Sequence, residues 1–198
     1  MTETISAEIS IAALKAGDRA EFARLAASFS APIYRLALKM TGDPSDAEDV
    51  LQNTFLKAMQ HIRGFEERSS LSTWMYRIAA NEALMTLRRR KFQVPVDENP
   101  DDSDEDLTPM QFSDWCCLPE GEFASAEARQ QLDQAIQQLP DSLRVVFLLR
   151  DIEGLSIKET GEALDLSETA VKTRLLRARL RLREKLSGYF GERLREVN

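Results

Sequence analysis

Basic side chains flank an apolar stripe in the segment Ala170–Leu186, AVKTRLLRARLRLREKL. When residues advance 100° each around a helix, one narrow face must pack against a core; it holds Val171, Leu175, Ala178 and Leu182. Its two sides carry Arg174, Arg177 and Arg181, and Lys172, Arg179 and Arg183. Such side chains bind phosphate oxygens, and Arg also pairs with base edges, so the pattern is typical of nucleic-acid recognition.

The face opposite this stripe suits a DNA major groove, because small side chains near the helix start lie between the basic sides; they are Thr169, Thr173 and Leu176. Upstream, LSIKETGEALDLSETAVKTRL predicts a short helix over Ile157–Leu164, a turn at Asp165-Leu166 and an N-cap at Ser167. This spacing is that of a helix-turn-helix. The alternative is a solvated basic helix in a bundle. The expected DNA contacts are Ser167, Thr169, Lys172, Thr173, Leu176, Arg177 and Arg181.

A second candidate surface lies in SLSTWMYRIAANEALMTLRRR. Its helical wheel predicts an apolar face of Leu71, Trp74, Met75, Ile78 and Met85. The strip beside that face holds Arg77, Asn81, Leu84 and Arg88. An amide and guanidinium groups beside an apolar face can bind single-stranded nucleic acid. Tyr76 lies off the apolar face, so we expect it, rather than a core Trp74, to stack on a base.

The segment SDAEDVLQNTFLKAMQHI predicts another amphipathic helix. Its expected buried residues are Val50, Leu51, Phe55 and Met59, which leave Asp46, Asp49, Gln52 and Asn53 outside. Two interpretations stay open. The polar face is either solvated, with its N-terminal acids favoured by the helix dipole, or it docks another protein.

The elements that position these residues are helices, since Gly and Pro are scarce and β-branched alternation is nearly absent. Capping boxes are predicted at Asp18–Glu21, Ser45–Glu48 and Ser156–Glu159. We expect an all-α protein of two small helical domains, residues 1–92 and 125–198, joined by a flexible acidic linker over 93–124.

Charge is unevenly distributed along the 198 residues, whose formal net charge is −7. The segment Gln93–Phe123 holds ten acidic residues without Lys or Arg, so the remainder carries a net charge of +3. Nucleic-acid binding therefore remains compatible with an acidic chain. The linker either folds back onto the basic helix or serves only as a solvated tether.

Few residues suit catalysis or metal binding. His61 is the single histidine, and no phosphate loop or nucleophile motif occurs, so we expect no enzyme activity and no cofactor. A zinc site of His61 with Cys116 and Cys117 is an alternative with an uncommon ligand spacing. Adjacent cysteines and the absence of a signal peptide or membrane span predict a cytoplasmic protein without direct membrane insertion.

Four segments closely resemble the extracytoplasmic function (ECF) sigma factors of the bacterial sigma-70 family. They are DAEDVLQNTFLKAM, STWMYRIAANEALMTLRRR, LPDSLRVVFLLRDIEGLSIKETGEAL and SETAVKTRLLRARLRL, which resemble regions 2.2, 2.3 to 2.4, 4.1 and 4.2 in that order. The resemblance covers nearly the whole chain apart from the linker. The family usually has Glu at Asn53, Ile-Ala at Thr160-Gly161 and Gly at Asp165. Gly161 is expected to weaken its helix by up to about 1 kcal/mol relative to Ala.

The resemblance implies an alternative sigma factor that binds core RNA polymerase and directs initiation at a restricted set of promoters. The partners that it implies are the clamp helices of the largest subunit, the flap of the second-largest subunit, promoter DNA and an anti-sigma factor that wedges between the two units. Asp49, Gln52 and Asn53, with Asp46 beside them, fall on the implied clamp-helix contact. A regulator that binds DNA but not polymerase is the rival interpretation.

The implied minus-10 contact centres on Asn81, which matches the asparagine at a flipped base, with the loop from Phe65 to Leu71 forming the pocket. The expected minus-10 residues are Phe65, Arg68, Ser69, Ser70, Tyr76, Arg77, Asn81 and Arg88. Lys172, Thr173, Leu176 and Arg177 match readers of the minus-35 element.

Overall fold

The structure, a computed structural model, describes residues 9–93 and 126–196, and every regular element in these two ranges is helical. The N-terminal unit comprises α2 (Ile11–Ala16), α3 (Arg19–Thr41), α4 (Pro44–His61), a 3₁₀ turn η1 (Ile62–Gly64) and α5 (Leu71–Gln93). The C-terminal unit comprises α6 (Ala126–Gln137), α7 (Asp141–Phe147), a π turn η4 (Leu148–Ile152), α8 (Ile157–Leu164) and α9 (Glu168–Glu196). The all-helical prediction is confirmed, whereas nearly all of the acidic linker, with Cys116 and Cys117, lies outside the described residues.

Capping explains where several helices begin. The predicted box at Ser156 is confirmed, because its Oγ accepts from the Glu159 amide at 3.2 Å and the Glu159 carboxylate accepts from the Ser156 amide at 2.8 Å. The box predicted at Ser45 is wrong. Helix α4 begins earlier, with Asp43 as N-cap and Pro44 at the first helical position, where a missing N–H costs nothing.

Asp18 caps α3 as predicted, accepting from the Ala20 amide at 2.8 Å. Glu21 does not complete that box. Its carboxylate turns to the Ser10 amide, 2.5 Å away, and so fastens the start of α2 to α3. The reciprocal contact predicted from sequence is therefore replaced by a tertiary one.

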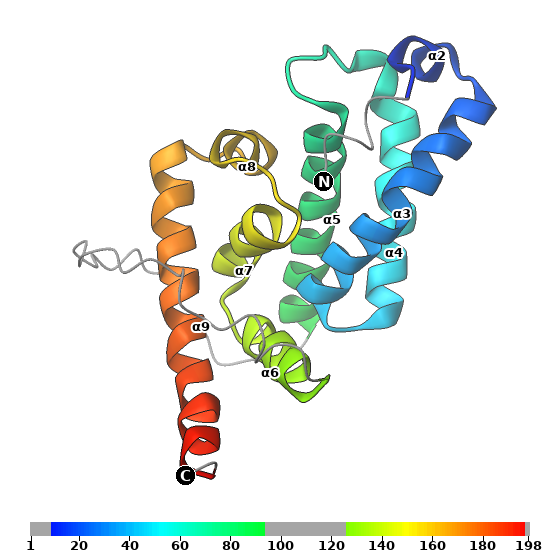
Figure 1. Ribbon diagram of the computed structural model, residues 1–198. Coiled ribbons are helices and arrows are strands. Elements are labelled where there is room, and N and C mark those ends of the chain that lie inside the picture. Colours follow the sequence, from blue (N-terminus) through cyan, green and yellow to red (C-terminus); the bar gives the residue numbers. More distant parts are fainter. Residues whose placement is uncertain (1–8, 94–125, 197–198) are drawn as a thin grey trace.

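The two units pack against each other along α5. Helices α3, α4 and α5 contact one another in the N-terminal unit, α9 packs on α6, α7 and α8, and α5 meets α8 across the boundary. Figure 1 shows α7 and α8 lying between the long helices α5 and α9. The buried apolar side chains form one continuous core through both units.

Candidate nucleic-acid interface

The helix-turn-helix has the predicted elements. Helix α8 spans Ile157–Leu164, and Asp165 ends it in the left-handed region at φ 56°, a conformation that Asp adopts at modest cost. The Leu166 amide closes the turn by donating to the Gly161 carbonyl at 2.9 Å. Ser167 then caps α9, since its Oγ accepts from the Ala170 amide at 3.1 Å. Local hydrogen bonds therefore fix where α9 begins relative to α8.

Helix α9 buries the predicted apolar stripe, because Val171, Leu175, Ala178 and Leu182 are all buried. On the expected DNA-contacting side, Ser167, Thr169, Lys172 and Thr173 are exposed, while Leu176, Arg177 and Arg181 are half-buried. Arg179 does not project freely from the helix. Its guanidinium pairs with both carboxylate oxygens of Asp151, at 2.7 and 2.9 Å, which raises the pKa of Arg179. The exposed residues on the expected DNA-contacting side therefore lie in the first turns of α9.

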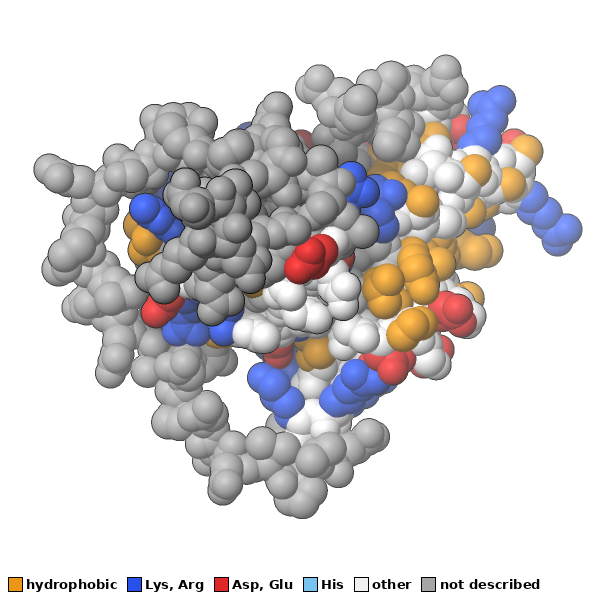
Figure 2. Space-filling view, turned by 60° about the horizontal axis from the view of Figure 1, so that its bottom comes forward, with side chains coloured by type: hydrophobic (Ala, Val, Ile, Leu, Met, Phe, Trp, Pro, Cys, Tyr) orange, Lys and Arg blue, Asp and Glu red, His pale blue; other side chains and the backbone are white. Residues whose placement is uncertain are grey.

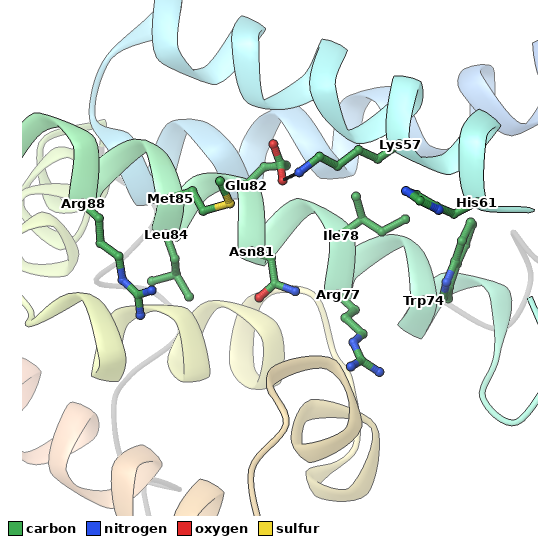
Figure 3. Close-up of a pocket in the computed structure, with 10 residues that line it drawn as sticks. All are labelled: Lys57, His61, Trp74, Arg77, Ile78, Asn81, Glu82, Leu84, Met85 and Arg88. Atoms are coloured by element: carbon green, nitrogen blue, oxygen red, sulfur yellow. Dashed lines mark hydrogen bonds and ion pairs between the residues drawn. The ribbon is translucent and has the colours of Figure 1, made fainter. Parts of the chain in front are cut away.

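A cavity of about 540 Å³ lies along α5 and is bordered by the C-terminal half of α4. Figure 3 shows His61 and Trp74 close together at one end, with the Lys57–Glu82 ion pair joining α4 to α5. Arg77, Asn81, Leu84 and Arg88 follow one side of α5 and point away from α4. The predicted strip is therefore present, with Arg77, Asn81 and Arg88 exposed.

Tyr76 is more buried, and Trp74 more accessible, than the helical wheel predicts. Tyr76 is only 2% exposed, and its hydroxyl donates to the Glu153 carboxylate at 2.6 Å, so it offers no ring for stacking in this conformation. Trp74 is half-buried and lines the cavity. Its side chain is supported by Phe65, whose ring centroid lies 5.1 Å away. Trp74 is therefore the aromatic side chain accessible from the cavity.

The loop before α5 supplies fewer accessible groups than expected. Phe65 is buried beneath Trp74, so its ring is not accessible to a base in this conformation. Arg68 is exposed and pairs with Glu66, while Ser69 is half-buried. Ser70 is exposed and its Oγ accepts from the Thr73 amide at 3.1 Å, which fixes the start of α5.

Helix α4 presents a mixed polar and apolar face. Asp49, Gln52 and Asn53 are exposed as expected, whereas Asp46 pairs with Arg90 at 2.6 Å. Leu56 and Met59 are each 55% exposed, so the prediction that Met59 is buried is wrong, and the helical wheel gave no indication of Leu56.

The reason is that α4 packs through small side chains, with Ala47, Thr54 and Ala58 in the core beside Val50. Five exposed residues recur at helical spacing and form one face; they are Asp49, Gln52, Asn53, Leu56 and Met59. In Figure 2, apolar side chains gather on the right, the side where α3 and α4 lie in Figure 1.

Among residues 9–93 and 126–196, no three His, Cys, Asp or Glu side chains come together as metal ligands. No helix in the described part of the chain is long and apolar enough to cross a membrane.

The model of sigma-70 region 2 matches residues 25–93, and that of sigma-70 region 4 matches residues 129–182. The ECF RNA polymerase sigma factor SigW of Bacillus subtilis is 34% identical over 173 residues, covering 87% of this chain and 92% of SigW. The ECF RNA polymerase sigma-E factor of Escherichia coli is 30% identical over 186 residues, covering 90% and 93% of the two chains.

Two solved structures share the fold. CnrH, in complex with the cytosolic domain of CnrY, superimposes with a TM-score of 0.64 at 23% identity, covering 90% of this chain and 95% of CnrH. The sigma factor RpoE from Bartonella quintana, in complex with the anti-sigma factor NepR, gives a TM-score of 0.62 at 23% identity, covering 84% and 97% of the two chains.

Proposed function

The chain belongs to the extracytoplasmic function sigma factors of the sigma-70 family, and we propose that its exposed faces divide the contacts of transcription initiation among them. As an alternative sigma factor it directs RNA polymerase to particular promoters. The observation that carries the assignment of faces is the pairing of an exposed helix-turn-helix with a separate Asn81 strip. A regulator that binds duplex DNA but not polymerase does not require the Asn81 strip of α5.

The polymerase contact lies on α4. Asp49, Gln52 and Asn53 supply polar groups. Leu56 and Met59 supply exposed apolar area, which does not stabilise the monomer and is typical of a protein interaction site. Asp46 contributes by holding Arg90, and with it α5, rather than by direct contact. In the C-terminal unit, Ile152 and Leu180 are 41% and 49% exposed and are the candidates for the flap contact.

The minus-10 contact follows α5. Asn81 offers both a donor and an acceptor to the edge of an unstacked base, and Arg77 and Arg88 lie in the same row for phosphates. Trp74 and His61 provide flat groups beside this row. Arg68, Ser69 and Ser70 border the base pocket from the preceding loop.

The minus-35 contact uses the first turns of α9. Thr169, Lys172 and Thr173 are exposed there and reach base edges, while Leu176 offers a methyl contact. Ser167 holds the helix start, and Arg177 and Arg181 follow the groove wall for phosphates. An anti-sigma factor that wedges between the units is the expected inhibitor; RpoE from Bartonella quintana, which shares the fold, forms a complex with the anti-sigma factor NepR.

Two substitutions separate the DNA contacts. Promoter fragments are first recovered from a random library with the reconstituted holoenzyme. Asn81→Ala should then impair open-complex formation while duplex minus-35 binding is retained, because Asn81 meets only an unstacked base. Lys172→Ala should instead weaken duplex binding, by about 1 to 3 kcal/mol at a base edge or with a smaller salt slope at phosphate. Equal loss of both steps in either variant contradicts the assignment.

A further inference from the structure

We propose that the short helix α2 positions the loop that borders the minus-10 base pocket, and that Lys15 is the residue through which it acts. The loop spans residues 65–70, between η1 and α5. Helix α2 lies outside the match to sigma-70 region 2, which begins at residue 25. The consequence for base selection rests on the proposed function, whereas the contact between α2 and the loop belongs to the isolated chain.

The loop contains a residue in an unfavourable backbone conformation. Glu67 has a φ of 58°, and among the described residues Asp165 is the only other residue besides glycine with a positive φ. Asp and Asn are several-fold enriched in the left-handed region, and a long side chain such as Glu is not. The sequence of the loop therefore does not by itself select the backbone of Glu67. A conformation of this kind persists where surrounding contacts hold it.

Lys15 makes the contact that holds Glu67. Its ammonium donates to Oε1 of Glu67 at 2.9 Å, across 52 residues of sequence. The neighbouring charges of the loop, Glu66 and Arg68, pair with each other. It is therefore the charged side chain at the left-handed residue that reaches another element.

Helix α2 is anchored firmly enough to hold the loop. Leu14, next to Lys15, is fully buried. Before the helix, the Ser10 amide donates to the buried carboxylate of Glu21 on α3 at 2.5 Å. After it, Gly17 adopts a φ of 84° and its amide donates to the Leu14 carbonyl at 3.0 Å. The helix also packs on η1, and Figure 1 shows it at the end of the N-terminal unit where α4 ends and α5 begins.

The two ends of the loop have anchors of their own. Phe65 is buried against Trp74, and Ser70 caps the start of α5. Loss of the Lys15 contact should therefore free the residues between these anchors, 66–69, and leave Trp74 and α5 in place. Because the freed loop can adapt to more than one base, the pocket should discriminate less between bases while still binding a strand.

The exposure of the ion pair sets the size of the effect. The Lys15 side chain is 32% exposed and that of Glu67 is 54% exposed. Ion pairs that are open to solvent are weak and are screened by salt. We therefore expect a change of about threefold at low salt, which falls as salt is added.

Initiation at promoters that differ at the flipped minus-10 base tests the consequence for base selection. Four versions of one recovered promoter carry the four bases at that position. Lys15→Gln should lower the ratio of initiation at the preferred base to that at the next base about threefold, whereas Lys15→Arg, which keeps the cation, should retain the wild-type ratio. An unchanged ratio in Lys15→Gln, or an equal loss on all four promoters, overturns the proposal. A wild-type chain that initiates on none of them contradicts the proposed function, and the positioning role is then judged by proteolysis.

Limited proteolysis of the isolated chain tests the contact without polymerase or DNA. Trypsin cleaves after Arg68, inside the loop, at a rate that follows how often the loop leaves its folded position. Lys15→Gln should raise the initial rate of this cut about threefold at low salt. The cut after Lys57 in α4 reports opening of the N-terminal unit as a whole and should stay unchanged. Lys158→Gln, which removes an exposed cation from α8, is the matched control and should change neither rate.

The partner substitution completes the experiment. Glu67→Gln removes the other half of the ion pair and should act like Lys15→Gln, with no further increase when the two are combined. A cut after Arg68 whose rate is unchanged in Lys15→Gln overturns the proposal. So does a rate that rises by the same factor as the cut after Lys57.

Discussion

Replacing Gly161 with alanine sets helix propensity against tertiary packing. Propensity alone favours Ala over Gly inside α8, by up to about 1 kcal/mol. The structure predicts the opposite sign. A Cβ at this position would lie 2.7 Å from the Leu166 carbonyl oxygen, closer than real Cβ contacts come.

The Leu166 carbonyl oxygen cannot easily move away from the added Cβ. Leu166 belongs to the turn and donates its amide to the Gly161 carbonyl at 2.9 Å, so moving the turn away stretches that bond. Overpacking costs about 1 to 3 kcal/mol, and a weakened hydrogen bond adds about 1 kcal/mol. After the gain in propensity, Gly161→Ala should lower the free energy of unfolding by about 1 to 3 kcal/mol.

Urea unfolding followed by helical circular dichroism measures this difference. With a slope of about 1 to 3 kcal/mol per molar urea, the midpoint should fall by roughly 1 M. Lys158→Ala is the matched control, because Lys158 lies on the exposed side of the same helix and its loss should change stability by less than about 0.5 kcal/mol. A midpoint for Gly161→Ala that is unchanged or higher refutes the packing argument.

Three further variants test the packing and the surfaces. Arg144→Met removes the donor of four hydrogen bonds to main-chain carbonyls and should lower the free energy of unfolding by about 3 kcal/mol or more; a loss below about 1 kcal/mol contradicts this. Burial raises the pKa of Glu153, so its stabilising contribution is greatest at low pH and is lost as pH rises through the raised pKa. Relative to Glu153→Gln, the wild-type chain should therefore gain unfolding free energy from pH 8 to pH 5, and a flat or inverted difference counts against the burial argument. The groups facing this carboxyl are Tyr76, Arg35 and Lys39. Leu56→Ser with Met59→Ser should weaken core polymerase binding at least tenfold without changing stability, and normal binding removes them from the contact.

Short-range features of the fold could be predicted because their partners lie within a few residues. Ser156, Asp165 and Ser167 define the helix-turn-helix by local hydrogen bonds and one left-handed residue. The buried stripe of α9 was also predictable, because apolar residues recur at helical spacing on one face and such a face packs against a core.

Other features depend on contacts between distant segments. Arg144 is buried because it donates to main-chain carbonyls, one of them 104 residues away, and no pattern of side chains indicates such acceptors. The buried Tyr76 hydroxyl donates to Glu153, 77 residues away, a partner that the neighbours of Tyr76 on its own helix do not indicate. Met59 and Leu56 look like core residues by type, yet small side chains form the packed face of α4.

Initiation with purified core polymerase tests the central claim most directly. The chain is mixed with bacterial core enzyme, the complex is isolated, and run-off transcripts are sequenced from a promoter library. The account predicts a stable complex and initiation at a restricted promoter set, both reduced by Leu56→Ser with Met59→Ser, with Asn81→Ala impairing initiation but not complex formation. Binding of promoter duplex without any association with core polymerase, in the absence of an inhibitor, would contradict it.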